Sequence, residues 1–303
     1  MTQANSPRLS EQGFVIVAVL WLVAALAALA LVFSIYLSNS ARALALGDTA
    51  AQTEALVSAG VELAAYQLQL AAEESRPAQG AFRIRIGSAD LAISYVSEAA
   101  RIDLNAAPKE LIAGLLSVLG AGEDEAREGA DRIVAWRTRS TPESAGNEDA
   151  LYRAAGRSYS PRQAPFVHIN ELGLVLGLSP ALVERALPFV TVFSGASGVD
   201  VLTAAPEVIA SLPGMTPLIL KAFLDERSAL PDDKTAIAAA LGTAAASASQ
   251  QRSRAYRILV RIRLPNGREN ASDVVIVLRN DEEPYRVLSW QDVTASFRAR
   301  RSS

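Results

Sequence analysis

The first forty residues constrain this chain more than any other part of it. An uncharged, apolar stretch from Phe14 to Leu37 follows a short polar leader that ends at Gly13. A helix needs about 20 apolar residues to span a bilayer, whereas the apolar core of a secretory signal peptide has about 7–15. The sequence therefore predicts one membrane-spanning helix. The small residues at 38–43 keep a conventional cleavage region open as an alternative.

The apolar stretch continues without a helix breaker into a more polar second half. Asp48, Glu54 and Glu62 lie among apolar residues at helical spacing, the pattern of a helix that packs one face against a domain. Arg76 and Pro77 end this pattern, because proline disrupts a helix interior. We therefore expect the membrane helix to be followed by a stalk helix.

Two groups of strands are predicted far apart in the sequence. Residues 82–86 and 91–96 alternate between apolar and polar side chains, as a half-buried hairpin does. Strand patterns return only near the end of the chain, at 256–264, 274–278 and 285–290. Because an isolated hairpin is marginally stable, we expect both groups to form one antiparallel sheet with a helical insertion between them.

The predicted fold class is α+β: a long N-terminal membrane and stalk helix, and a small antiparallel sheet split by a large all-helical insertion. Because the chain has 303 residues, it is long enough for more than one typical domain. We divide it into a leader (1–13), a transmembrane helix (14–37), a stalk helix (38–76), a first sheet part (77–98), the insertion (99–251), a second sheet part (252–296) and a tail (297–303).

The insertion contains an internal repeat. Two segments end in Ala-Ala-Pro, at Pro108 and at Pro206, and each precedes an apolar helix. Asn105 and Thr203 stand three residues before these prolines, where a short polar side chain acts as a cap or turn residue, and proline suits a first helical turn. The repeat predicts two related helical units of a helix-hairpin-helix or SAM-like kind.

Such hairpins also occur in DNA-binding proteins, where backbone N–H groups contact a phosphate. Here Pro217 removes one donor, and the acidic residues at 123–125 and 225–226 would repel phosphate. The formal net charge of −3 also argues against a nucleic-acid partner. DNA binding or DNA uptake by a membrane-anchored protein is therefore kept as an alternative to the function considered below.

The residues that catalyse reactions or bind metals are sparse. The chain has no cysteine, and its single histidine, His168, cannot form a metal triad. Carboxylates are grouped at 123–125, 232–233 and 281–283, but none has EF-hand spacing. The sequence therefore predicts no enzyme and no cofactor, with calcium left open as a ligand whose contacts are unassigned.

The start of the chain resembles the leader of type IV prepilins, in which glycine is followed by phenylalanine and an apolar helix. In that family a prepilin peptidase cuts after the glycine and N-methylates the new first residue. The resemblance places the cut after Gly13 and the methyl group on Phe14. The fifth mature position, usually glutamate in pilins, is Ala18 here.

Members of the minor pseudopilin K family of type II secretion (general secretion pathway protein K) typically lack this glutamate. Asn-Ala-Ala-Pro before an apolar helix, present here from Asn105 to Pro108, is also typical of them, as is a pilin-like sheet with a large helical insertion. The resemblance implies a complex with the minor pseudopilins I and J and with other pseudopilus subunits.

The resemblance also implies a place and a role. The chain would cross the inner membrane once, with its bulk in the periplasm. The complex would lie at the pseudopilus tip, initiate the fibre and support export of folded proteins across the outer membrane. A further alternative is a simple membrane-anchored scaffold protein.

Overall fold

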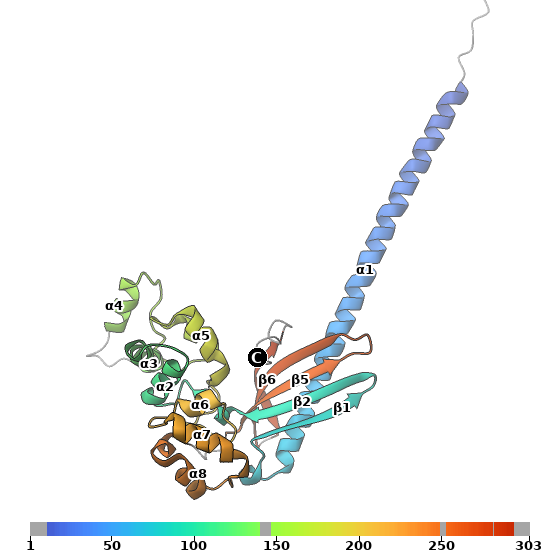
Figure 1. Ribbon diagram of the computed structural model, residues 1–303. Coiled ribbons are helices and arrows are strands. Elements are labelled where there is room, and N and C mark those ends of the chain that lie inside the picture. Colours follow the sequence, from blue (N-terminus) through green and yellow to red (C-terminus); the bar gives the residue numbers. More distant parts are fainter. Residues whose placement is uncertain (1–10, 140–146, 249–252, 281, 294–303) are drawn as a thin grey trace, which may run out of the picture. The chain divides into compact units, whose positions relative to one another are not determined.

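The computed structural model describes residues 11–139, 147–248, 253–280 and 282–293 (Figure 1). The chain divides into two compact units, Met1–Leu56 and Val57–Ser303, and helix α1 (Glu11–Leu70) contributes to both. In the first unit, Val17–Tyr36 is long and apolar enough to cross a membrane, and none of it is buried within the protein. This segment is consistent with a single-pass anchor.

The second unit contains a five-stranded antiparallel sheet. Its order is β1-β2-β5-β6-β7, so that β2 from the first group of strands pairs with β5 from the second. The prediction of one sheet split in sequence is confirmed. The strands are β1 (Gln79–Ile86), β2 (Ala89–Ser97), β5 (Ala255–Arg263), β6 (Glu269–Leu278) and β7 (Tyr285–Asp292).

The last turns of α1 pack on one face of this sheet. A Cβ atom at Gly60 would lie 3.0 Å from a methyl group of Val260 and 3.4 Å from Cγ1 of Ile93. Glycine, which weakens an exposed helix, therefore permits close packing here. Arg76 lies beyond the helix, and its Nε donates a hydrogen bond of 2.8 Å to the carbonyl oxygen of Leu68, one of the unpaired acceptors at a helix end.

The insertion has its own hydrophobic core, which includes Leu111, Ile133, Phe166, Val208 and Phe223. Its helices are α2 (Lys109–Val118), α3 (Glu123–Arg137), α4 (Asn147–Ala154), α5 (Pro180–Ala186), α6 (Pro206–Ala210), α7 (Pro217–Glu226) and α8 (Lys234–Leu241). Short 3-10 helices follow or separate these elements: η1 (Glu73–Ser75), η2 (Glu98–Ala100), η3 (Ile169–Leu174), η4 (Leu187–Phe189), η5 (Arg227–Ala229) and η6 (Gly242–Ser247).

One detail of the predicted insertion differs: it is not entirely helical. Strands β3 (Ile102–Asp103) and β4 (Val190–Thr191) form a parallel pair, which the N–H of Leu104 extends with a 2.8 Å hydrogen bond to the carbonyl of Thr191. Strands of two residues are too short to show an alternating pattern, and their partners lie far apart in the chain. The pair places the start of the insertion beside its middle.

Candidate functional site

The residues predicted to direct processing lie at the start of α1. Because the helix begins at Glu11, Gly13 and Phe14 have helical backbone. Ala18 is exposed on this helix. Residues 1–10 lie outside the described part of the chain, and cleavage after Gly13 and methylation of Phe14 stay predictions.

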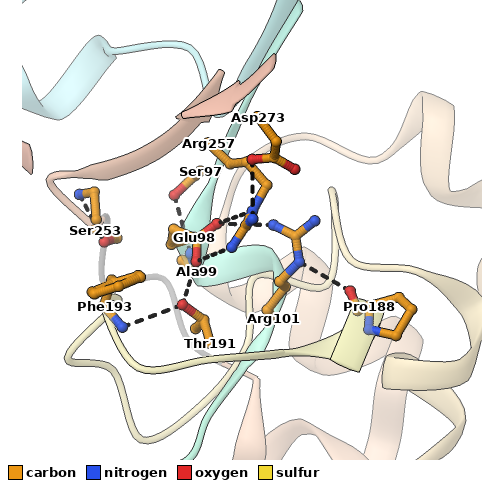
Figure 2. Close-up of polar contacts among 11 residues, drawn as sticks. Ser97, Glu98, Ala99, Arg101, Pro188, Thr191, Phe193, Ser253, Arg257 and Asp273 are labelled. Carbon is orange, nitrogen blue, oxygen red and sulfur yellow. Dashed lines mark hydrogen bonds and ion pairs between the residues drawn. The ribbon is translucent and has the colours of Figure 1, made fainter. Parts of the chain in front are cut away.

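A buried charge cluster joins the sheet to the insertion (Figure 2). The carboxylate of Glu98, in η2, accepts hydrogen bonds from Arg101 at 2.8 Å, from Arg257 at 2.8 and 3.3 Å, and from the hydroxyl of Thr191. Arg257 also donates to the carboxylate of Asp273 at 3.0 Å. Arg257 and Asp273 belong to β5 and β6, and Thr191 belongs to β4. The cluster therefore connects three parts of the chain that are distant in sequence.

The charges in this cluster are balanced and largely excluded from solvent. The side chain of Glu98 is 0% exposed and that of Arg257 is 16% exposed. Burial raises the pKa of Glu98, but the charges of Arg257 and Arg101 and the hydrogen bonds to the carboxylate outweigh it, so the pKa lies below its ordinary value. Burial lowers the pKa of Arg257, and the charges of Glu98 and Asp273 outweigh that effect and raise it. Both groups are charged at neutral pH, and removing either would leave the buried charges of the cluster unbalanced.

The internal repeat is built on two aspartates that the sequence motif did not single out. The carboxylate of Asp103 accepts from the N–H of Asn105 at 2.8 Å, and that of Asp200 accepts from the N–H of Leu202 at 3.1 Å. Each aspartate carbonyl accepts from the N–H four residues later, at 2.8 and 2.9 Å. The two turns therefore correspond at an offset of 97 residues.

This offset corrects the predicted alignment, which was 98 residues because it matched the two Ala-Ala-Pro segments. Pro206 is the first residue of α6, whereas Pro108 is the N-cap residue of α2, where Ala205 is its equivalent. Asn105 does not cap the following helix. Its side-chain amide instead exchanges two hydrogen bonds with the backbone of Phe166, at 2.7 and 3.0 Å.

An arginine holds each turn from the end of a later helix. Arg137, the last residue of α3, donates to the carbonyls of Leu104 at 2.6 Å and Ala107 at 2.7 Å. Arg227, which follows α7, donates to the carbonyl of Ala204 at 2.8 Å. Ala107 and Ala204 are equivalent at the 97-residue offset, so these arginines are the corresponding contacts of the two units.

The turn at residues 212–216, just before α7, was the candidate DNA-binding hairpin. Its surroundings offer little positive charge to a phosphate. Lys221, a cation in the following helix α7, forms an ion pair with Asp225 at 2.7 Å. At the equivalent hairpin of the first unit, Arg127 pairs with Glu123 and Asp124, each at 2.8 Å. These pairs neutralise the cations that a phosphate would need.

The edge strand β7 exposes apolar side chains. Val287, Leu288 and Trp290 are 41%, 36% and 37% exposed, respectively, and among the described residues β7 pairs on one side only, with β6. An edge strand with apolar side chains is a ready surface for another polypeptide.

His168 links the insertion to the same edge strand. Its Nδ1 accepts from the N–H of Asn170 at 3.1 Å at the start of η3, and its Nε2 lies 3.1 Å from the side-chain amide of Gln291 in β7. A capping contact explains this histidine without catalysis.

Within the described part of the chain, no three His, Cys, Asp or Glu side chains gather as metal ligands, and Asp281 of the third acidic group lies outside it.

Comparison with solved structures shows a related fold. One chain of "The Crystal Structure of the GspK-GspI-GspJ complex from enterotoxigenic Escherichia coli Type 2 Secretion System" matches with a TM-score of 0.59 at 18% identity, covering 80% of this chain and 96% of that chain. A search of curated proteins gave no match. Residues 91–195 match the family described as "Type II secretion system (T2SS), protein K".

The segment at 91–195 is therefore similar to protein K of type II secretion, and the chain shares the fold of the solved structure. The part that matches the protein K family extends from β2 to the segment after β4 and contains Glu98 and the first turn with its arginine. Arg257, Asp273 and the second helical unit of the insertion, which begins at Asp200, lie beyond it. The charge cluster therefore joins the matched protein K segment to the C-terminal strands of the sheet.

Proposed function

We propose that this protein is a minor pseudopilin that assembles with pseudopilins I and J at the tip of the pseudopilus, initiates the fibre and supports export of folded proteins across the outer membrane. The observation that carries the proposal is the protein K match over residues 91–195 in a chain that also has a long apolar helix at Val17–Tyr36. Before assembly the helix anchors the chain in the inner membrane, with the second unit in the periplasm.

The absence of glutamate at the fifth mature position supports the tip position. In a pilus shaft that carboxylate would neutralise the amino terminus of an adjacent subunit in an apolar environment, where an unpaired charge is costly. A subunit with no neighbour above it has no such terminus to neutralise. Ala18 carries no charge that would need such a partner.

The first test is the mature amino terminus. The chain is co-expressed with a prepilin peptidase, and the membrane-extracted protein is measured by intact mass spectrometry. We expect a chain that starts at N-methylated Phe14, and an unprocessed precursor for Gly13→Val, because the resemblance places the cut directly after this glycine. Gln12→Ala is the matched control and should be processed. An intact Met1, or cleavage near residue 41, would contradict the proposal.

The second test is assembly. Co-expressed pseudopilins I and J should co-purify with the processed chain at fixed stoichiometry after detergent extraction. A duplex DNA titration at low salt, where phosphate binding is strongest, distinguishes the alternative function. Tight DNA binding without recovery of I and J would favour a DNA-uptake protein instead.

A further inference from the structure

A cleft of about 320 Å³ opens between the sheet and the second helical unit. Its volume is at the lower end of the range for small-ligand sites, about 300–1,000 Å³. Gln79 and Ser228, at its rim, are exposed, whereas Leu202, Ile237 and Tyr256 give it apolar walls. Arg227 also lines the cleft and supplies a positive charge beside these apolar walls.

The corresponding arginine of the first unit shows what is unusual about Arg227. Arg137 uses two guanidinium nitrogens on two carbonyls of its turn. Arg227 holds its turn with Nη1 alone, and in the described part of the chain its Nε and Nη2 have no hydrogen-bond partner. One of the two equivalent arginines thus keeps donors available, and it is the one that lines a cleft.

Other charged groups in the cleft restrict the ligand. Both oxygens of the Asp200 carboxylate are occupied, by the N–H of Leu202 and the hydroxyl of Thr203. Asp232, at the exposed side of the cleft, already has an interaction of its own. A multiply charged anion would meet these carboxylates, whereas a single carboxylate with an apolar group beside it would not need to approach them. A planar guanidinium binds such a carboxylate through two parallel hydrogen bonds.

We propose that this cleft binds the free carboxylate of a peptide whose last residue is apolar, with the carboxylate on Arg227 and the apolar side chain against Leu202, Ile237 and Tyr256. A polypeptide C-terminus and a small free carboxylic acid share this chemistry. The amide N–H groups that precede a C-terminal residue give the peptide further contacts with the polar rim. The proposal is independent of the role in pseudopilus assembly.

The test uses the full chain in detergent micelles and isothermal titration calorimetry. The probes are N-acetyl-Ala-Leu with a free carboxylate, its C-terminal amide, and isobutyrate as the small acid. We expect the free-acid peptide to bind about tenfold or more tightly than the amide, since a hydrogen-bonded charge pair is replaced by neutral contacts. Isobutyrate should bind more weakly than the peptide. A preference for isobutyrate would assign the cleft to small acids and overturn the peptide.

Arg227→Gln should abolish the preference for the free acid, and Arg185→Gln, which removes an exposed cation elsewhere in the insertion, should preserve it. Ser228→Trp fills the rim without touching the turn and should block all binding, which keeps the test decisive where Arg227→Gln weakens the fold. Equal binding of acid and amide, no binding, or an equal effect of Arg185→Gln would overturn the proposal.

Discussion

The backbone carbonyl oxygen of Ser211 lies 2.2 Å from where a Cβ atom of Gly114 would stand. These two residues occupy equivalent positions in the two helical units, at the 97-residue offset set by Asp103 and Asp200. Helix α2 therefore meets the end of α6 at corresponding positions, and glycine at 114 leaves room for the Ser211 carbonyl. The two units pack as a related pair and share one core.

Gly114→Ala should destabilise the protein, because the contact is with backbone atoms that cannot rotate away. We expect a loss of about 1–3 kcal/mol in the free energy of unfolding, the usual cost of forcing an extra methyl group into a packed interior. The measurement is urea unfolding followed by circular dichroism. Gly173→Ala is the matched control, since a Cβ there meets nothing within 4 Å. Equal stability of the two variants would contradict this account of the crossing.

Glu98→Gln should strongly destabilise the compact unit Val57–Ser303. The substitution keeps the shape of the side chain but leaves Arg101 and Arg257 without the buried negative charge between them. Breaking a buried ion pair by removing one partner costs about 3–5 kcal/mol. Asp90→Asn, which breaks the exposed pair with Arg85 on the same sheet, is the control and should leave the unfolding midpoint almost unchanged.

The effect of Glu98→Gln should depend on pH in a defined direction. The folded-state pKa of Glu98 is lowered below its ordinary value of 4.5, because its arginine partners outweigh burial. The charged carboxylate therefore contributes its full stability above pH 4.5 and loses it as the pH falls through the lowered folded-state pKa. Urea midpoints of the wild type and the variant should differ by a constant amount from pH 7 to about pH 5 and converge below pH 4.5. A difference that grows on acidification would show that the pKa is raised instead.

The local patterns of the sequence predicted the elements, but the contacts between distant segments were not visible in it. Alternation at 256–264 identified β5, because neighbouring residues alternate between a buried and an exposed face. The pairing of Glu98 with Arg257 joins residues 159 positions apart, and nothing in the local pattern of either residue specifies a partner. Sequence reasoning therefore found the sheet and missed the charge cluster.

The repeat was identified from its two Ala-Ala-Pro segments, and aligning these segments placed the two units one residue out of register. Ala-Ala-Pro is conspicuous, but alanine and proline form few specific contacts. The aspartates at 103 and 200 fix the turns through side-chain hydrogen bonds. An aspartate six residues before a helix start, with an arginine at a later helix end, is the signal that could have identified Arg137 and Arg227.

Ala18→Glu should not improve secretion. If the chain occupies the tip, an added carboxylate in the apolar helix gains no amino terminus to pair with and bears the cost of desolvation. The measurement is export of a native substrate by a strain in which the variant replaces the wild type, with Ala18→Gln as the uncharged control. A marked gain in export for the glutamate variant alone would place the subunit in the shaft.

Leu288→Asp should weaken assembly with pseudopilins I and J while leaving the fold intact. Leu288 is 36% exposed on the edge strand β7, beside Val287 and Trp290, so a carboxylate there would disrupt an apolar contact with a partner more than the protein's own core. Leu218→Asp, at a leucine that is 79% exposed on α7, is the matched control and should leave assembly unchanged. Co-purification yields and circular dichroism melting curves separate the two effects. Loss of assembly with Leu218→Asp but not with Leu288→Asp would move the partner surface from the sheet edge to the insertion.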